Sequence, residues 1–259
     1  MKLAALQAVL DTEKLWSIAV SGGIDSMTLA TIAHQYLPHK PQMYHATSPA
    51  VSKRETDRIR NHAALEKWNL TVIDAGEFED EKYRSNPINR CYFCKAHLYE
   101  SIFRAISKSN RQIASGTNLD DQNDFRPGLQ AARQFSVRHP LVDAEIDKEG
   151  VRDLARYLGL SFSELPAQPC LSSRVETGIR IESRDLQFID KVESLLRAQS
   201  SGQSIIRVRL KRGGILVETD CDKSNWPELG ELASRQSKES GYKFLGIREY
   251  RRGSSFVGK

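Results

Sequence analysis

Residues 20–26 read Val-Ser-Gly-Gly-Ile-Asp-Ser and lie between an apolar run at 15–20 and a helix-like stretch at 27–36. The two adjacent glycines allow the backbone to turn sharply where a strand ends. The backbone N–H groups of such a turn, and of the helix that follows it, converge on one point and favour an anion there. The hydroxyl groups of Ser21 and Ser26 add further donors. The stretch therefore predicts a phosphate-binding loop at the junction of a strand and a helix.

Two common types of phosphate-binding loop are excluded by the pattern of residues 20–26. A Walker A loop needs Gly-x-x-x-x-Gly-Lys-Ser/Thr and a dinucleotide-binding turn needs Gly-x-Gly-x-x-Gly, and residues 20–26 match neither pattern. Ser-Gly-Gly-x-Asp-Ser instead resembles the PP-loop of ATP pyrophosphatases, which adenylate an oxygen or carboxylate and release pyrophosphate. In this setting Asp25 could bind Mg²⁺ or accept a hydrogen bond from a backbone amide. The alternative interpretation is an ordinary strand-to-helix turn.

The first two-thirds of the chain alternates strand and helix patterns. Expected strands cover 15–20, 43–47, 70–73 and 112–115, and expected helices cover 26–36, 55–68 and 92–106. Such alternation is typical of an α/β fold, a parallel sheet with helices on both faces, in which ligands gather at the carboxyl ends of the strands. We expect the phosphate loop and Gly116-Thr117-Asn118, which follows a later strand, to share that edge.

The pattern changes after Cys170. A capped helix over 147–158 ends at Gly159, and the rest of the chain then predicts a compact α+β arrangement, with helices over 183–198 and 227–240 and strands over 205–210, 215–219 and 244–250. We therefore predict two domains. Residues 1–170 form the PP-loop domain, and residues 171–259 form a smaller α+β domain for substrate binding and oligomerisation.

Composition and charge are those of an ordinary enzyme. Of the 259 residues, 39% are hydrophobic and 27% are charged, and no apolar run reaches the length that a membrane span needs. The first residues resemble a signal peptide only weakly, so we expect a cytoplasmic protein. The net charge of +5 is modest, and an anionic small molecule explains it as well as nucleic acid does. We therefore expect a small-molecule nucleotide substrate, no membrane partner and a homo-oligomer.

The four cysteines point to chemistry rather than to disulfides. Cys91 and Cys94 form a Cys-x-x-Cys, Cys170 lies between Pro169 and Leu171-Ser172-Ser173-Arg174, and Cys221 stands alone. A zinc site would need a fourth ligand at a matching spacing, and none lies beside Cys170. Three thiolates in one pocket would suit a [4Fe–4S] cluster with one open iron. Cys170 could instead be a thiolate activated by Arg174, and a packed or incidental role is the remaining alternative, which we favour for Cys221.

Six motifs occur in the order found in the LarE family, and they cover nearly the whole chain. They are Ser21 to Ser26, Asn89-Arg90-Cys91-Tyr92-Phe93-Cys94-Lys95, Gly116-Thr117-Asn118-Leu119-Asp120-Asp121, Asp124-Phe125-Arg126-Pro127-Gly128, Pro169-Cys170-Leu171-Ser172-Ser173-Arg174 and Tyr250-Arg251-Arg252-Gly253-Ser254. The chain thus resembles ATP-dependent sulfur transferases of nickel-pincer nucleotide synthesis. The resemblance implies that ATP adenylates a carboxylate of pyridinium-3,5-biscarboxylic acid mononucleotide, that a sulfur nucleophile displaces AMP, and that a thiocarboxylate is released.

The resemblance also implies roles for individual residues. Those expected to bind ATP and Mg²⁺ are Ser21, Gly22, Gly23, Asp25, Ser26, Gly116, Thr117, Asn118 and Asp121. Cys170 becomes the sulfur-bearing residue, and Glu193 matches a family glutamate near it, so the catalytic set is Cys170, Glu193 and Asp25. Arg207 and Arg209 alternate in an expected strand and so face the same way. In the family such an Arg-x-Arg binds the substrate phosphate with help from Arg251, whereas the alternative is a solvated strand face.

The source of the sulfur has two possible forms. Family members that carry only the Cys170 equivalent give up its sulfur and are left with dehydroalanine, whereas members with three cysteines hold a cluster and turn over repeatedly. Because this chain has Cys91, Cys94 and Cys170, we favour the cluster. The rival enzymes are a PP-loop tRNA thiolase or amide synthetase, which would need a nucleic-acid-binding appendage or an ammonia channel. A different class is a non-catalytic carrier of nucleotides or iron–sulfur clusters. Such a protein would keep the phosphate loop or the cysteines, but it would need no Arg-x-Arg to bind an acceptor substrate.

Overall fold

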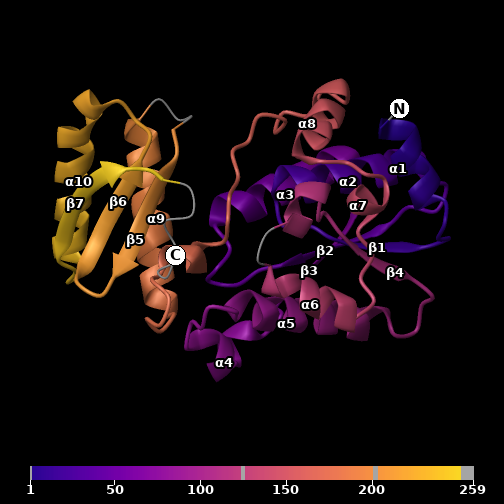
Figure 1. The fold of residues 1–259 in the computed structure, drawn as a ribbon, viewed down its shortest axis with the longest axis horizontal. Coiled ribbons are helices and arrows are strands. Elements are labelled where there is room, and N and C mark those ends of the chain that lie inside the picture. Colours follow the sequence, from indigo (N-terminus) through magenta and orange to yellow (C-terminus); the bar gives the residue numbers. More distant parts are fainter. Residues whose placement is uncertain (1, 124–125, 201–203, 252–259) are drawn as a thin grey trace. The chain divides into compact units, whose positions relative to one another are not determined.

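The computed structural model describes residues 2–123, 126–200 and 204–251. They group into two compact units, which we describe separately (Figure 1). The first unit comprises Met1–Ser48, Lys53–Asp80 and Asn89–Gln168, and the second comprises Pro49–Ser52, Glu81–Ile88 and Pro169–Lys259. The predicted domain boundary at 170 remains a prediction, because compactness alone does not show which part binds substrate or forms an oligomer.

A four-stranded parallel sheet forms the centre of the first unit, as the alternating pattern predicts. Its strands are β1 (Trp16–Ala19), β2 (Gln42–Ala46), β3 (Asn69–Ile73) and β4 (Gln112–Ser115), and their order in the sheet is β3-β2-β1-β4. Ile18 of β1 lies opposite Met43 of β2 and Ala114 of β4. The strand after which the phosphate loop begins is therefore an inner strand, and residues that follow β2 and β4 reach the same edge.

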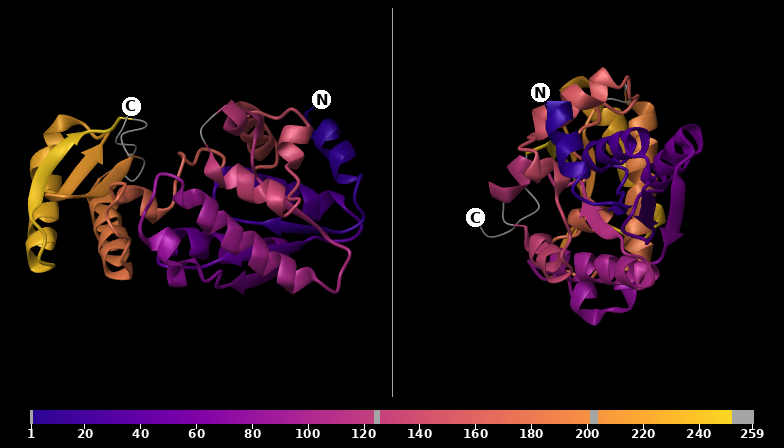
Figure 2. Two further views of the ribbon diagram at one scale, coloured as in Figure 1. Left: turned by 60° about the horizontal axis from the view of Figure 1, so that its bottom comes forward. Right: turned by 90° about the vertical axis from the view of Figure 1, so that its right-hand side faces the viewer.

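Helices cover both faces of this sheet (Figures 1 and 2). One face carries α1 (Lys2–Leu10), α2 (Ile24–Tyr36), α3 (Lys53–Glu66), α7 (Pro140–Asp143) and α8 (Lys148–Tyr157), and the other carries α5 (Arg90–Ile106) and α6 (Pro127–Gln134). The strands supply both cores because side chains alternate along them. In β1, Trp16 and Ile18 belong to the first core and Ala19 to the second. The α/β fold class is confirmed.

The first described residues form a helix that the sequence analysis did not predict. The weakly signal-like stretch forms helix α1, and its Leu6 and Leu10 are fully buried. The sequence analysis also missed the short helices α6 and α7, each of which begins at a proline. Proline fits the first turn of a helix because the N–H that it lacks would have no partner there.

The second unit is a three-stranded sheet with two long helices. Its elements are α4 (Glu81–Arg84), the 3-10 turn η3 (Leu171–Arg174), α9 (Ser183–Gln199), β5 (Ile206–Lys211), β6 (Gly214–Thr219), α10 (Trp226–Glu239) and β7 (Phe244–Glu249). Strands β5 and β6 form an antiparallel hairpin, and β7 joins β6 in parallel after α10. Each expected long helix and strand of this region is present, and none of its ends shifts by more than one residue.

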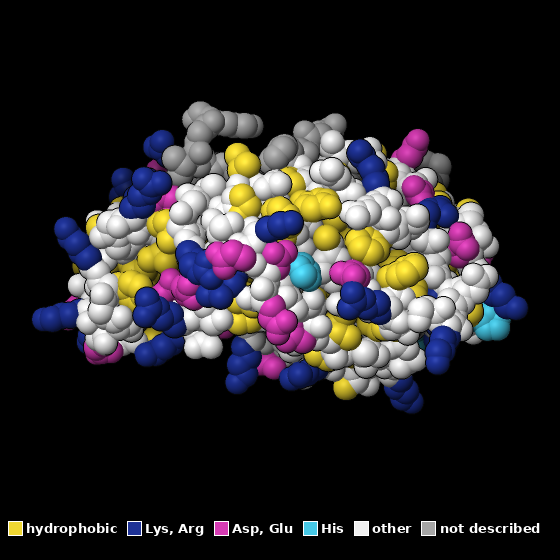
Figure 3. Space-filling view, turned by 90° about the horizontal axis from the view of Figure 1, so that it is seen from below, with side chains coloured by type: hydrophobic (Ala, Val, Ile, Leu, Met, Phe, Trp, Pro, Cys, Tyr) yellow, Lys and Arg dark blue, Asp and Glu magenta, His cyan; other side chains and the backbone are white. Residues whose placement is uncertain are grey.

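The surface and the helices bear on the expected partners. None of the helices in the described ranges combines the length and apolar character that a bilayer crossing needs. On the face seen in Figure 3, Lys and Arg side chains are interspersed with Asp and Glu rather than gathered in one basic area.

Candidate functional site

The phosphate loop is a closed turn built around Ser26. The Ser21 backbone N–H donates to Ser26 Oγ at 3.1 Å, the two serine hydroxyls lie 3.2 Å apart, and Ser26 Oγ donates to the Gly23 carbonyl at 3.3 Å. Gly23 precedes α2 and offers no side chain to cap it. The N–H groups at the start of α2 are therefore left for an anion, which the positive end of the helix dipole also favours.

Two glycines are required here by close packing. Gly22 has φ +82°, and a Cβ on it would lie 3.1 Å from Glu55 Cβ. Gly116 follows β4, and a Cβ there would lie 2.5 Å from the backbone N and Cα of Ser26. No side chain can be inserted at that distance. The segment after β4 therefore packs backbone to backbone against the phosphate loop, as we expect for two loops at one sheet edge.

Asp25 connects the loop to two other segments of the first unit. Asn118 Nδ2 donates to Asp25 Oδ1 at 3.0 Å, and Lys148 Nζ donates to Asp25 Oδ2 at 2.6 Å. Of the two partners that the sequence left open for Asp25, the described residues supply no backbone amide. The Asp25 side chain is 23% exposed. Its carboxylate is thus accessible at the edge of the sheet.

The turn after β4 is internally hydrogen-bonded. Asn118 Oδ1 accepts from the Asp120 N–H at 3.1 Å, and the Asn118 N–H donates to Asp121 Oδ2 at 3.2 Å. Burial raises the pKa of Asp121, while Arg126, 2.7 Å away, opposes that change. Thr117 Oγ1 lies 3.0 Å from Ser115 Oγ. The expected nucleotide residues of the two loops therefore come together in the first unit.

The three cysteines of the expected cluster belong to different units. Cys91 and Cys94 lie in the first turns of α5, one exposed and one half-buried, and their spacing of three places them on one helix face. Cys170 belongs to the second unit. Within the described residues, no three or more Cys, His, Asp or Glu side chains are grouped so as to hold a metal ion. Cysteine thiolates are suitable cluster ligands, so the donor chemistry fits while the geometry stays a prediction.

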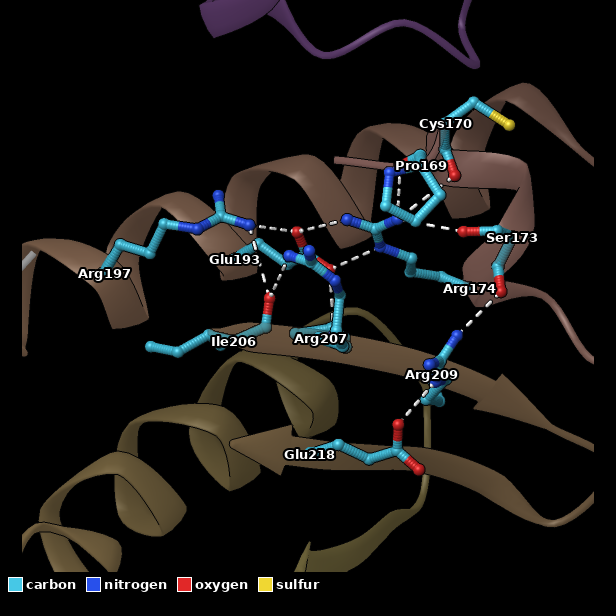
Figure 4. Close-up of polar contacts among 11 residues, drawn as sticks. Pro169, Cys170, Ser173, Arg174, Glu193, Arg197, Ile206, Arg207, Arg209 and Glu218 are labelled. Atoms are coloured by element: carbon cyan, nitrogen blue, oxygen red, sulfur yellow. Dashed lines mark hydrogen bonds and ion pairs between the residues drawn. The ribbon is translucent and has the colours of Figure 1, made fainter. Parts of the chain in front are cut away.

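Cys170 begins a hydrogen-bonded turn of the second unit. It precedes η3, whose Leu171 N–H donates to the Ala50 carbonyl at 2.9 Å and whose Ser172 Oγ lies 2.6 Å from the Tyr83 hydroxyl. Arg174 Nη1 donates to the carbonyls of Pro169 at 2.5 Å and Cys170 at 3.2 Å. The Cys170 sulfur points away from this guanidinium group (Figure 4). Arg174 therefore fixes the backbone at Cys170, and the predicted direct activation of the thiol by Arg174 has no support in the structure.

Glu193 lies beneath this turn and is almost fully buried. Its Oε1 accepts from Arg174 Nε at 2.9 Å and from the Val208 N–H at 3.0 Å, and its Oε2 pairs with Arg197 (Figure 4). Burial alone would raise the pKa of Glu193, but Arg174 and the other nearby arginines outweigh it and lower that pKa. Glu193 therefore positions Arg174, which in turn binds the backbone carbonyl of Cys170. Its predicted catalytic role remains a prediction.

Arg207 and Arg209 lie on β5 and are 4% and 5% exposed. The alternative of a solvated strand face is therefore wrong. Arg209 Nε donates to Glu218 Oε2 at 2.8 Å, and its Nη1 donates to the Ser173 carbonyl at 2.8 Å. Burial lowers the pKa of Arg207 to about 10, and the nearby Arg174 acts in the same direction. A cation that is disfavoured in this way gains from binding an anion.

The sequence analysis missed some residues and could not place others. Lys148 was expected only as part of a helix, and Glu218 only as part of a strand. A lysine in the first turn of a helix opposes the helix dipole, and that position is a signal that could have drawn attention to it. Arg251 is exposed after β7. The motif residues Asp124, Phe125, Arg252, Gly253 and Ser254 lie outside the described residues.

Comparison with known proteins places the chain among its relatives. No protein-family model matches it. An uncharacterized protein of Synechocystis sp. is 35% identical over 202 residues, which cover 78% of this chain and 75% of the relative. An uncharacterized protein of Methanocaldococcus jannaschii is 30% identical, with 89% and 87% covered. The pyridinium-3,5-bisthiocarboxylic acid mononucleotide synthase of Lactiplantibacillus plantarum is 26% identical, with 95% and 90% covered. Together with the phosphate loop and the parallel sheet, these relatives show that the chain belongs to the LarE family of PP-loop proteins.

Proposed function

We propose that this protein is an ATP-dependent sulfur transferase that converts a carboxylate of a small nucleotide into a thiocarboxylate. The observation that carries the proposal is the phosphate loop with its uncapped helix, held against the turn after β4 by the contact of Asn118 with Asp25. The relative from Lactiplantibacillus plantarum, whose name specifies a bisthiocarboxylic acid product, supports the choice of substrate class.

The first step would be adenylation of the substrate. A carboxylate oxygen bonds to the α-phosphorus of ATP, the bond from that phosphorus to the bridging oxygen breaks, and pyrophosphate leaves. Ser21, Ser26 and the backbone N–H groups at the start of α2 would bind the phosphates of ATP. Negative charge builds up on the leaving pyrophosphate during this step, and these donors would stabilise it. Mg²⁺, when bound, would be held by carboxylates of Asp25 and Asp121 and would neutralise phosphate charge. The residues present fit that cation, because carboxylate oxygens are its usual protein ligands.

The second step would be attack by sulfur on the acyl adenylate. In the form that needs only Cys170, its thiolate bonds to the carbonyl carbon and AMP leaves. Loss of the Cys170 α-proton and cleavage of its Cβ–S bond would then release the thiocarboxylate and leave dehydroalanine. The turn that Arg174 and Glu193 hold would keep Cys170 in one position, which lowers the entropy lost on reaching the transition state.

The finer proposal concerns the cluster. Cys91, Cys94 and Cys170 would hold a [4Fe–4S] cluster with one open iron, which would carry the additional sulfide that is transferred. The buried Arg207 and Arg209, with Arg251, would bind the phosphate of the acceptor nucleotide. Burial lowers the pKa of Arg207 because it disfavours the charged guanidinium group. A bound phosphate would stabilise that charged form.

The adenylation proposal is tested by pyrophosphate release. The full chain is mixed with ATP, Mg²⁺ and pyridinium-3,5-biscarboxylic acid mononucleotide, and pyrophosphate and AMP are measured with and without the acceptor. We expect both products only when the acceptor is present. ATP cleavage on addition of tRNA or ammonia instead, with none on addition of the pincer precursor, would identify a tRNA thiolase or amide synthetase and contradict the proposal. Binding of ATP without cleavage would identify a carrier.

The sulfur source is tested by mass and by iron content. Protein purified without oxygen should contain iron and sulfide and should form more than one product per chain when sulfide is supplied. Substitution of Cys91, Cys94 or Cys170 by Ala should remove the cluster, whereas Cys221→Ala serves as the control. The sacrificial form predicts instead an iron-free active protein that stops after one product and loses about 34 Da, the mass of hydrogen sulfide, at Cys170.

A further inference from the structure

The carbonyl group of Gly22, inside the phosphate loop, is bound by an arginine of helix α3. Arg58 Nη1 donates to the Gly22 oxygen at 2.7 Å. A hydrogen bond from a guanidinium group is charge-assisted, and it is stronger than one between neutral groups. The same nitrogen donates to Gln168 Oε1 at 3.4 Å, which is the weaker of the two contacts. Arg58 is half-buried, so water competes only in part for its donors.

Helix α3 also approaches the loop through its backbone. A Cβ on Gly22 would lie 3.1 Å from Glu55 Cβ and 3.2 Å from the Glu55 carbonyl oxygen. Glu55 and Arg58 are three residues apart and therefore lie on one face of α3. The first turns of α3 thus hold Gly22 in two ways. The backbone at Glu55 limits how far the loop can move, and Arg58 binds the carbonyl group.

The peptide between Gly22 and Gly23 needs such an anchor because both of the residues that it joins are glycines. Gly22 has φ +82° and Gly23 has φ −79°. Glycine adopts positive and negative φ about equally well, so these two residues by themselves restrain the orientation of their shared peptide only weakly. Rotation of that peptide by about half a turn would exchange the positions of its oxygen and its N–H.

The anchor on the oxygen also sets the direction of the N–H. Within the described residues there is no cis peptide bond, and in a planar trans peptide the C=O and N–H bonds point in opposite directions. Because the Gly22 oxygen faces Arg58, the Gly23 N–H points away from Arg58. Gly23 directly precedes α2, whose first N–H groups are not capped by its side chain. A rotated peptide would present an oxygen to an anion in place of a donor.

We propose that Arg58 is a positioning residue for ATP, which binds the Gly22 carbonyl and thereby directs the Gly23 N–H toward the phosphates. The inference rests on the proposed function for the identity of the anion. Arg58 acts through the peptide, and it keeps its contact with Gly22 when ATP is bound. The Gly23 N–H then adds one donor to those that the start of α2 supplies.

The orientation of the peptide is tested first without ATP. Glycine-selective isotope labelling and amide NMR compare the parent with Arg58→Met, Arg58→Lys and Arg60→Met. Arg60 is exposed on the same helix, so its replacement is the charge-matched control. Arg58→Met should shift or split the amide signals of Gly22 and Gly23 and leave that of the distant Gly159 unchanged. Arg58→Lys, which keeps a charged donor, should change the two signals less, and Arg60→Met should leave them in place.

Equilibrium binding tests the consequence for the nucleotide. Isothermal titration of the full chain uses ATP and adenosine, which lacks phosphates, with Mg²⁺ and without an acceptor. Arg58→Met should weaken ATP binding by about tenfold to a hundredfold and leave adenosine binding within about twofold of the parent, since a donor to phosphate is lost. Arg58→Lys should restore ATP affinity to within about threefold. Arg60→Met should leave both affinities within about twofold, because solvent and salt screen an exposed charge.

Three outcomes would overturn the inference. The first is a folded Arg58→Met variant whose Gly22 and Gly23 signals coincide with those of the parent, whatever its affinity for ATP. The second is unchanged ATP binding in that variant. The third is an equal loss for ATP and adenosine, which would mean that Arg58 only supports the fold. If Arg58→Met does not fold, Arg58→Gln, which also lacks the charge, replaces it with the same expectations. A parent that does not bind ATP, but whose two glycine signals depend on Arg58, would contradict the proposed function instead.

Discussion

The phosphate loop of the first unit and the arginine cluster of the second unit are both polar, but they are built in opposite ways. The loop uses small residues and backbone groups at a helix start, and its charged members, Asp25 and Lys148, remain partly exposed. The arginine cluster, defined here as Arg174, Arg207 and Arg209 with their carboxylates Glu193 and Glu218, is almost fully buried.

The difference predicts what substitution will do at each place. Backbone donors at a helix start cost little to maintain, because the fold leaves them free in any case. A buried ion pair must overcome the loss of hydration of both groups, so removal of one partner leaves an uncompensated charge in the interior. We therefore expect loop substitutions to remove activity with little loss of stability, and we expect substitutions that break an ion pair of the cluster to lower stability.

The largest effect is expected for Glu193→Ala. The change leaves Arg174 and Arg197 without the carboxylate that pairs with both, and it should lower the free energy of unfolding of the second unit by about 3–5 kcal/mol. Denaturant unfolding read by segment-resolved hydrogen exchange measures it. The control is Glu164→Ala, since Glu164 is 68% exposed and pairs with Arg156 at the surface, where solvent screens the pair and little loss of stability is expected. Equal losses would remove the contrast between buried and exposed pairs.

The next effect is expected for Ser26→Ala in the phosphate loop. The Ser26 hydroxyl contacts the Ser21 N–H and the Ser21 hydroxyl, so its loss should reduce kcat/KM for ATP cleavage by the equivalent of about 2–4 kcal/mol, with the melting temperature nearly unchanged. Steady-state pyrophosphate release and a thermal melt on the same sample test both parts. A variant that keeps AMP formation would show that the loop does not bind the reacting phosphates.

A smaller effect, and a sharper comparison, is expected for Arg207→Ala. If Arg207 binds the acceptor phosphate, its removal should raise KM for the acceptor by an amount that corresponds to about 1.5–3 kcal/mol of lost binding free energy. KM for ATP should stay unchanged. Arg209→Ala is the matched variant, because its contacts with Glu218 and Ser173 make a structural role measurable as lost stability. Equal changes of KM for ATP and acceptor would mean that Arg207 only supports the fold.

The smallest effect near neutral pH is expected from titration, and it separates the two units. Burial lowers the pKa of His45 and His62 below the ordinary value of 6.5, so both imidazoles are neutral in the folded first unit at neutral pH. Their contribution to stability is present above pH 6.5 and declines as the pH falls below it, because the unfolded chain then binds protons first. Because the pKa of Glu193 is lowered in the folded state, its contribution to the stability of the second unit is fully present above pH 4.5 and declines only below it. Hydrogen exchange at several pH values should show the first unit loosening first; the opposite order would contradict this account.

The fold could be predicted largely from the sequence because its signals are local. Each strand and long helix of the parallel sheet follows the expected apolar pattern, and Asp147 caps α8 as expected. Helix α1 was not predicted, and it is its packing on α7 and α2 that buries Leu6 and Leu10. Helices α6 and α7 are too short for periodicity to detect.

The candidate site was predictable only in part, and for a physical reason. The sequence by itself determined the phosphate loop, because a strand, two glycines and a helix start are adjacent in the chain and their backbone groups need no distant partner. Only the tertiary structure showed that Lys148 lies 2.6 Å from Asp25, and that Arg207 and Arg209 are buried with Glu193 and Glu218 rather than solvated. Charged partners found far apart in sequence are chosen by burial and distance, which depend on the fold and not on any local pattern.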